Sequence, residues 1–206
     1  MTKARNAGGR PRELRVDTSI AQAVVAVLAD HGYAGLTMDA VATRAGVSRA
    51  AIYRRYANKQ EMAFTVLLHD LDESAPADSG SLRGDLCALT EEIAAQVSAS
   101  GPDTLHGLLA DIRADPALNE RFATTYLSVE RGIIATLLDR AVERGELARR
   151  PDPGVVQALL LGPLYAWLIV LDDDPERAPA LAQLVAGMVT EALTAGLLPV
   201  QPWSRR

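Results

Sequence analysis

The sequence predicts an all-α protein with an N-terminal three-helix helix-turn-helix unit and a larger C-terminal helical domain. Hydrophobic residues make up 49% of the 206 residues, whereas aromatic residues make up only 4%. This balance favours helices packed on helices, because strands prefer β-branched and aromatic residues. From residue 17 onward, apolar residues recur three and four positions apart, as they do along one face of a helix.

The first two helices are marked by capping residues. We expect residues 1–14 to form a flexible basic arm, because Gly, Pro and basic side chains dominate them. Asp17 is the candidate N-cap of the first helix, and Gly32 its candidate end. Thr37 can cap a second short helix over residues 37–45.

A sharp turn follows the second helix. Gly46 can adopt the positive φ that ends a helix, and Ser48 is a good N-cap for a third helix over residues 49–56. Helices of these lengths joined by short turns are typical of a helix-turn-helix. We place this unit at residues 15–60.

The rest of the chain is predicted to be helical. Asn58 and Glu61 have the spacing of a capping box, which opens a longer fourth helix. Beyond it, prolines mark helix starts, because the missing N–H costs nothing in a first turn. We expect helices near 81–100, 102–114, 116–145, 152–172 and 176–197. Together with the fourth helix they form a domain over residues 61–200, and residues 201–206 are a tail.

Charge is distributed unevenly along the chain. Residues 1–60 hold ten basic and four acidic side chains, a net charge of +6, while the rest of the chain carries −11. A basic front end on an acidic body indicates a polyanionic partner for the front end alone. A solvated basic arm without a partner is the alternative that charge by itself leaves open.

A recognition helix would explain why basic residues gather in the third helix. In a helix-turn-helix this helix presents its N-terminal residues to base edges in the major groove of DNA, and the preceding helix crosses the backbone. Arg49 can bond guanine or hold a phosphate, and Tyr53 can donate its hydroxyl to a phosphate. Arg10 and Arg12 of the arm can enter the minor groove. The expected DNA-contacting residues are Arg10, Arg12, Thr37, Arg44, Ser48, Arg49, Ala50, Tyr53, Arg54, Tyr56 and Lys59. A helical hairpin with exposed arginines is the alternative.

Residues 16–63, and above all HGYAGLTMDAVATRAGVSRAAIYRRYANKQEM, resemble the DNA-binding domain of TetR-type transcriptional regulators. The family pattern has a Thr opening the second helix, Val-Ala within it, Ala-Gly-Val-Ser at the turn, a Tyr in the recognition helix and a Lys opening the fourth helix. The matching residues are Thr37, Val41-Ala42, Ala45-Gly46-Val47-Ser48, Tyr53 and Lys59. The resemblance is specific over about a quarter of the chain and rests on architecture alone beyond it.

Two departures from the family pattern bear on the DNA sequence recognised. The Gly-Thr pair common after the Ser is Ala50-Ala51 here, which removes one hydroxyl contact. The usual His-Phe after the tyrosine is Arg55-Tyr56, and Arg55 could replace a histidine contact to phosphate.

The resemblance implies a homodimer that reads a palindromic operator in double-stranded DNA and responds to a small molecule, most simply as a repressor. The last two long helices of each subunit would form the dimer interface, in accord with their apolar character. Ligand pockets are mostly apolar with few polar groups, so we expect a lipophilic effector. The candidate lining residues are Phe64, Leu68, His106, Leu108, Ile112, Phe122, Tyr126 and Trp167, with His106 or Tyr126 as polar anchor. Pro163 could kink its helix and open space near Trp167.

Other classes of protein are less consistent with the sequence. The chain has three histidines without metal-ligand spacing and none of the phosphate-binding or nucleophile motifs of common enzymes, so we expect no catalytic residue, metal or cofactor. A non-specific architectural DNA-binding protein is disfavoured by the acidic body. A DNA-binding regulator that senses no small molecule remains open.

The chain is expected to be cytoplasmic. The single cysteine, Cys87, excludes an internal disulfide, and the N-terminus lacks the apolar region of a secretory signal. Residues 155–171 approach the length of a membrane span, but Gln157, Gly162 and Pro163 interrupt them and acidic residues follow. We therefore expect a buried or interface helix and no membrane partner.

Overall fold

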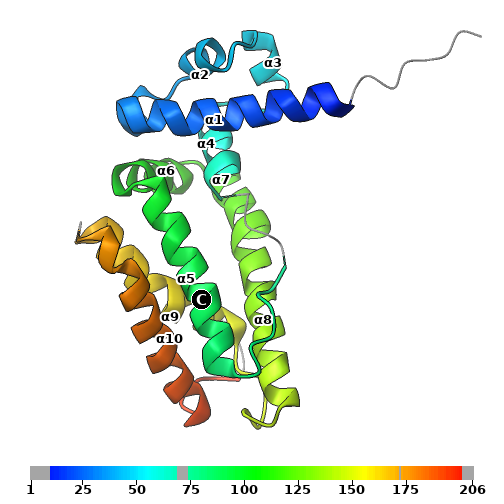
Figure 1. Cartoon of the computed structure of the whole chain (residues 1–206), viewed down its shortest axis with the longest axis vertical. Coiled ribbons are helices and arrows are strands. Elements are labelled where there is room, and N and C mark those ends of the chain that lie inside the picture. Colours follow the sequence, from blue (N-terminus) through cyan, green and yellow to red (C-terminus); the bar gives the residue numbers. More distant parts are fainter. Residues whose placement is uncertain (1–9, 69–73, 172, 201–206) are drawn as a thin grey trace, which may run out of the picture.

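The computed structural model describes residues 10–68, 74–171 and 173–200, and within them all side chains except those of residues 10–14, 68 and 102. Throughout these ranges the regular elements are helices, which confirms the predicted all-α fold. A small N-terminal unit lies across one end of a longer helical bundle (Figure 1).

Three helices form the N-terminal unit: α1 (Arg10–Gly35), α2 (Met38–Ala45) and α3 (Arg49–Tyr53). Apolar side chains from all three meet in one core, where Ile20, Val41 and Ile52 are fully buried. The predicted amphipathic spacing therefore buries one face of each short helix against its neighbours.

The first helix begins earlier than the sequence indicated. It starts at Arg10, so residues 10–14, expected in a flexible arm, are helical, and residues 1–9 lie outside the described part of the chain. Pro11 is tolerated because it lies in the first turn, and no helix breaker follows it. Asp17 is consequently inside the helix and is not an N-cap. The predicted end is confirmed, because the regular helix is interrupted at Gly32 (φ 63°).

Capping residues mark the end of the third helix and the start of the fourth. The third helix is shorter than predicted and ends at Tyr53, since Arg54 is its C-cap. The fourth helix, α4 (Lys59–Leu68), opens as predicted with the Glu61 N–H donating to Asn58 Oδ1 at 2.8 Å. Glu61 Oε2 accepts the Ala57 N–H at 2.7 Å, one residue before the N-cap, so the return bond of a regular capping box is shifted by one residue.

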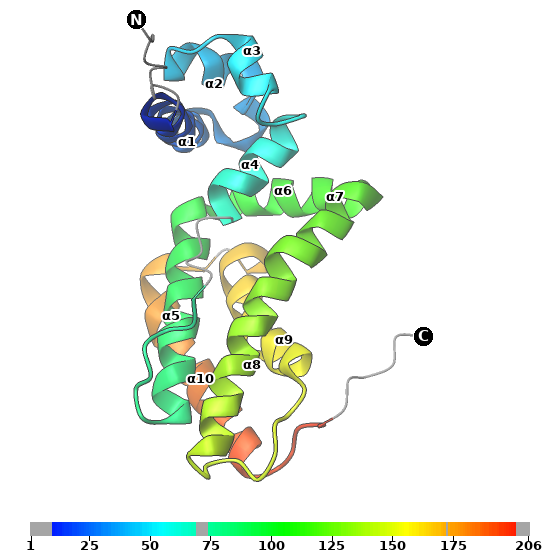
Figure 2. The ribbon, with the colours of Figure 1, turned by 90° about the vertical axis from the view of Figure 1, so that its right-hand side faces the viewer.

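The C-terminal body continues from α4. Its elements are α5 (Leu82–Ser100), α6 (Pro102–Ala114), α7 (Pro116–Arg121), the π-helical η1 (Phe122–Leu127), α8 (Ser128–Glu143), α9 (Pro153–Tyr165), the π-helical η2 (Ala166–Val170), the short 3₁₀ turn η3 (Pro175–Arg177) and α10 (Ala178–Thr194). The bundle is formed by α5, α8, α9 and α10, with the most extensive packing between α5 and α10. Figure 2 shows α6 and α7 crossing the end of this bundle beneath the N-terminal unit.

Two of the long helices expected in the body are interrupted by π-helical turns. The segment predicted as one helix over residues 116–145 consists of α7, η1 and α8, and that over 152–172 consists of α9 and η2. Pro163 lies inside α9 shortly before η2, where it removes one backbone donor. A π-helical turn changes the hydrogen-bond spacing and is frequent at functional sites.

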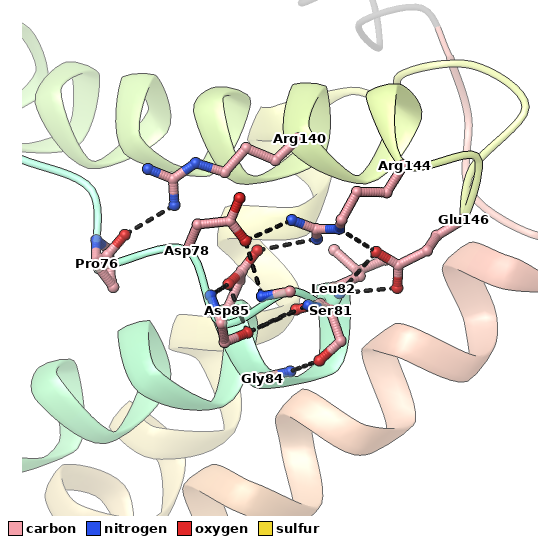
Figure 3. A network of polar contacts seen from close by, with 11 residues as sticks. Pro76, Asp78, Ser81, Leu82, Gly84, Asp85, Arg140, Arg144 and Glu146 are labelled. Atoms are coloured by element: carbon pink, nitrogen blue, oxygen red, sulfur yellow. Dashed lines mark hydrogen bonds and ion pairs between the residues drawn. The ribbon is translucent and has the colours of Figure 1, made fainter.

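A polar network fastens the start of α5 to the end of α8 (Figure 3). Arg144 donates to Asp78, Asp85 and Glu146 over 2.7, 3.0 and 2.6 Å. Both Glu146 oxygens accept the Leu82 N–H, at 3.1 and 2.9 Å, at the first turn of α5. Desolvation of the buried Asp85 carboxyl opposes its ionisation, but hydrogen bonds from Ser79 and Arg144 outweigh this and lower its pKa. The network therefore has a structural role.

One stretch of the described chain, Pro153–Val170, is long and apolar enough to span a membrane by length and composition alone. Of its residues, 28% are buried inside the monomer. One face packs on α8 and α10, while Leu159, Gly162, Pro163 and Ala166 on another face are exposed. Such an apolar face is typical of an interface.

Candidate DNA-binding surface and effector region

Short-range contacts form the turn between α2 and α3. The Thr37 hydroxyl accepts the Ala40 N–H at 3.1 Å, and the Ser48 hydroxyl accepts the Ala51 N–H at 3.2 Å, which confirms both predicted N-caps. Gly46 has the predicted left-handed conformation, with φ 65°. These contacts set the direction in which α3 leaves the turn.

Helix α3 has one buried and one exposed face. Ile52 and Ala51 are buried against the N-terminal core. The predicted DNA-contacting residues Arg49 and Tyr53 point outward, with 70% and 56% exposure respectively. Ser48, Ala50 and Arg54 are also exposed. This arrangement is the one that a recognition helix needs, since its outer face must be free to enter a groove.

Acidic residues that sequence analysis missed pair with two of the arginines. Arg49 Nε lies 2.6 Å from Asp39 Oδ1. Arg44 Nη1 donates to Asp30 Oδ2 at 2.5 Å. All four side chains are largely exposed, so both pairs are open to exchange with phosphate.

The other basic residues are placed differently. Arg55, which could replace a histidine contact to phosphate, is one-fifth exposed in the free protein. It donates to Asp17 and, over 3.1 Å, to the Ala51 carbonyl, and so ties the end of α3 to α1. Lys59 Nζ lies 4.6 Å from the centre of the Tyr33 ring, while Tyr56 is half-buried. The side chains of Arg10 and Arg12 lie outside the described part of the chain.

A second set of contacts joins the N-terminal unit to the body. The Tyr33 hydroxyl of α1 and the Gln60 amide of α4 both donate to Asp111 Oδ2 of α6, at 2.8 and 3.0 Å. Burial, reinforced by Asp111, raises the pKa of Tyr33, which keeps the hydroxyl a donor. The Tyr33 ring lies directly on Gly107, where a Cβ would be 2.4 Å from ring atom Cδ1.

Helix α4 is also tied to α7. Arg121 Nη1 donates to Glu61 Oε1 over 2.7 Å. Desolvation opposes ionisation of Glu61, but the hydrogen bonds from Arg121 and the Ala57 N–H prevail and lower its pKa. Nearby, a cleft of about 440 Å³ opens between α1, Leu67 and the turn from α5 to α6. These polar contacts therefore supplement the apolar packing between the N-terminal unit and the body, beside an open cleft.

The structure brings together some of the predicted effector-contacting residues and separates others. The Phe122 ring packs edge-on against the Phe64 ring, with 5.8 Å between ring centroids, and stacks on the Tyr126 ring, with 5.3 Å between centroids. Leu108 and Ile112 are buried in the core. His106 is exposed on α6, so it is not placed to anchor a ligand inside the body. Trp167 is half-buried and donates to the Asp174 carbonyl at 3.3 Å, and the Leu68 side chain lies outside the described part.

A buried polar group that sequence analysis did not single out lies beside Tyr126. Glu130, one turn further on, is 1% exposed, and its Oε2 accepts the Gln157 amide at 2.8 Å. Burial, only partly offset by this bond, raises the pKa of Glu130 to about 7. Tyr165 also faces the carboxyl, and burial raises its pKa to about 12. Two features of the sequence could have indicated this buried pair: a Gln within the most apolar helix, and a Glu one turn after a Tyr.

Comparisons with known proteins agree with this architecture. Residues 20–66 match the family described as bacterial regulatory proteins, tetR family, and residues 76–188 match the tetracyclin repressor-like C-terminal domain. An uncharacterized HTH-type transcriptional regulator of Mycobacterium tuberculosis is 30% identical over 185 residues, 89% of each chain.

Solved structures share the fold at lower identity. A TetR-family regulator from Mesorhizobium loti has a TM-score of 0.63 at 23% identity, covering 90% of this chain and 98% of that one. FadR from Bacillus subtilis, in complex with stearoyl-CoA, has a TM-score of 0.60 at 17% identity, covering 87% and 98%. Members of the matched family are DNA-binding, dimerising regulators of transcription and not enzymes. The chain belongs to the TetR family of transcriptional regulators.

Proposed function

We propose that this regulator is a ligand-responsive repressor that binds an inverted-repeat operator as a homodimer in the cytoplasm. The observation that carries the proposal is the exposed face of α3, where Arg49, Ala50 and Tyr53 project from a helix anchored by the buried Ile52. An outward Arg at the N-terminal end of such a helix can bond guanine, and a neighbouring Tyr can bond phosphate. Occupation of an operator by such a dimer would hinder transcription.

The dimer would form through α9 and α10. On α10, Leu184 and Met188 are 59% and 64% exposed and lie one turn apart. On α9, Leu159 is exposed close to small residues that allow near approach. A two-fold axis would bring these faces together and present two α3 helices to two half-sites.

An effector would act through the contacts between body and N-terminal unit. A ligand shifts an equilibrium only by its different affinity for two states. Ligand in the body would favour a second position of α4 and α6, and the shared acceptor Asp111 would carry that shift to Tyr33 on α1. A coupling free energy of about 1–3 kcal/mol is typical of such linkage. The apolar, aromatic surroundings of Phe122 support a lipophilic effector, as does the stearoyl-CoA bound by a protein of the same fold.

The test is selection of bound sequences from random duplex DNA with the full-length protein. We expect enrichment of an inverted repeat that Arg49→Ala loses. Arg150→Ala is the matched control, because Arg150 also forms an exposed ion pair, with Asp139, but lies in the body. Binding without an enriched motif would favour an architectural DNA-binding protein, and absence of binding would overturn the proposal.

A further inference from the structure

The Glu130 carboxylate is a buried acceptor that is only half used. Its Oε2 accepts the Gln157 Nε2–H, whereas its Oε1 has no hydrogen-bond partner within the described part of the chain. Leaving a buried charged oxygen unpaired costs free energy. Such groups are rare in native proteins and call for a partner or a role.

Neither Gln157 nor Arg131 supplies the missing donor. Gln157 uses both amide hydrogens, one on Glu130 and one on the Leu127 carbonyl at 3.0 Å. The Arg131 guanidinium donates to Gln157 Oε1 at 3.1 Å and not to the carboxylate. The Tyr126 hydroxyl is also without a hydrogen bond of good geometry to a described residue, although the Tyr165 hydroxyl is close enough to affect its pKa.

Apolar and aromatic groups lie next to this acceptor. Tyr126 stacks on Phe122, and Phe122 meets Phe64, so a row of rings leads from Glu130 to α4. Aromatic faces attract cations as well as apolar groups. Phe122 and Tyr126 belong to the π-helical η1, while Tyr165 directly precedes the π-helical η2, and segments of this kind are often functional.

We propose that Glu130 and Tyr126 form the polar end of an effector site that binds a lipophilic ammonium ion. The N–H donors of the ammonium would bond Glu130 Oε1 and the Tyr126 hydroxyl. Its positive charge would balance a carboxylate that has no cationic hydrogen-bond partner among the described side chains. The apolar tail would lie along Phe122 and Phe64. An anionic head group would instead be repelled by the carboxylate.

The same geometry links occupancy to DNA binding. The rings are in contact, so a bound tail must separate Phe64 from Phe122. Phe64 belongs to α4, which also carries Gln60 and Glu61, two of the residues that join the N-terminal unit to the body. Occupancy would therefore displace α4. This inference rests on the proposed ligand-responsive function and names the chemical class of its effector.

The test is titration calorimetry of the full-length protein at pH 8, above the raised pKa of Glu130, with three probes of equal chain length: dodecylammonium, dodecanoate and dodecanol, each below its micelle concentration or solubility limit. We expect dodecylammonium to bind the wild type at least about tenfold more tightly than Glu130→Gln, a loss of about 1.4 kcal/mol or more. Dodecanol should bind both proteins equally, whereas dodecanoate should bind Glu130→Gln more tightly than the wild type, because the variant lacks the repelling carboxylate. Glu130→Asp, which keeps the charge, should retain part of the preference, and circular dichroism would establish that each variant is folded.

Three outcomes would overturn the inference: tighter binding of dodecanoate than of dodecylammonium by the wild type, dodecylammonium binding that Glu130→Gln leaves unchanged, or no saturable binding of any probe, which would leave internal water as the partner of Glu130. Calorimetry needs no DNA, so it is independent of the operator test. DNA binding without an ammonium response contradicts this inference alone, whereas failure of sequence-specific DNA binding contradicts the proposed function.

Discussion

Arg49 and Asp39 form an ion pair on the outer side of the helix-turn-helix, with 2.6 Å between Arg49 Nε and Asp39 Oδ1. The pair joins the first turn of α2 to the first residue of α3. In the free protein, the arginine best placed to meet DNA is therefore already bound to a carboxylate. In the proposed binding mode DNA would compete with that carboxylate, which would itself be repelled by phosphates.

Asp39→Asn should strengthen DNA binding. Exposed ion pairs contribute only about 0.2–1 kcal/mol to stability, so the fold should be preserved while Arg49 is released. We expect affinity to rise about three- to tenfold at low salt and the gain to shrink as salt screens the charges. Fluorescence anisotropy with labelled duplex would measure it. Asp139→Asn, which removes a similar exposed partner of Arg150 in the body, should have no effect. A loss of affinity would mean that Asp39 itself contacts DNA.

Gly107→Ala should weaken the contact between the N-terminal unit and the body. The new Cβ would lie 2.4 Å from Tyr33 Cδ1, so the ring must move and its hydrogen bond to Asp111 must lengthen. Overpacking of this kind costs about 1–3 kcal/mol, against a gain of up to about 1 kcal/mol from helix propensity. Urea unfolding should show net destabilisation. Gly132→Ala, where open space surrounds the added methyl, should stabilise, and equal effects at the two positions would contradict the predicted close packing.

Arg144→Met should destabilise the body, because it removes the cation from the buried Asp85. The Ser79 N–H and hydroxyl would still bond the carboxylate, so we expect a loss of about 2–3 kcal/mol in the free energy of unfolding. Arg140→Met is the control. Arg140 donates to the Pro76 carbonyl at 2.8 Å, so its replacement should lower the free energy of unfolding by about 1 kcal/mol. If the double variant Arg144→Met, Asp85→Asn were no more stable than Arg144→Met alone, the unpaired charge would not be the cause.

Glu130 predicts a dependence of stability on pH. Its pKa is raised from 4.5 to about 7 in the folded protein, so between those values the folded state holds a proton that the unfolded state has released. The stability from this group is therefore greatest below about pH 4.5 and falls as pH rises to about 7, by up to about 3 kcal/mol. Urea titrations of wild type and Glu130→Gln at pH 5 and pH 8 would measure it. The variant should lose this part of the dependence, and parallel behaviour of the two proteins would count against a raised pKa of the buried Glu130.

Leu184→Glu combined with Met188→Glu should disrupt the proposed dimer. A two-fold interface contains each residue twice, so the two substitutions place four carboxylates in a surface that would otherwise be buried and apolar. We expect the dimer dissociation constant to rise about 100-fold or more, measured by sedimentation. Val25→Lys, at another exposed apolar residue on α1, should leave it unchanged. A dimer that withstands both α10 substitutions would place the interface elsewhere.

The sequence by itself was sufficient for the features that depend on neighbouring residues. The caps at Thr37 and Ser48, the left-handed Gly46 and the bond from Glu61 N–H to Asn58 all form between residues at most four positions apart, so the residue types reveal them directly. Periodicity likewise indicated the buried faces, and hence an all-α fold with an outward recognition helix. The start of α1 was predicted too late because Asp17 is a good N-cap residue. Residues 10–16 can also be helical, and the helix begins at Arg10.

Only the tertiary structure decided which distant side chains meet. Tyr33 and Asp111 are 78 residues apart, and Glu130 and Gln157 are 27 apart, so no local pattern pairs them. The engagement of Arg55 by Asp17 and the outward position of His106 likewise follow from how helices pack. Helix packing determines which polar atoms lose water and which partners remain within reach. The unpaired oxygen of Glu130 is therefore a property of the folded chain alone.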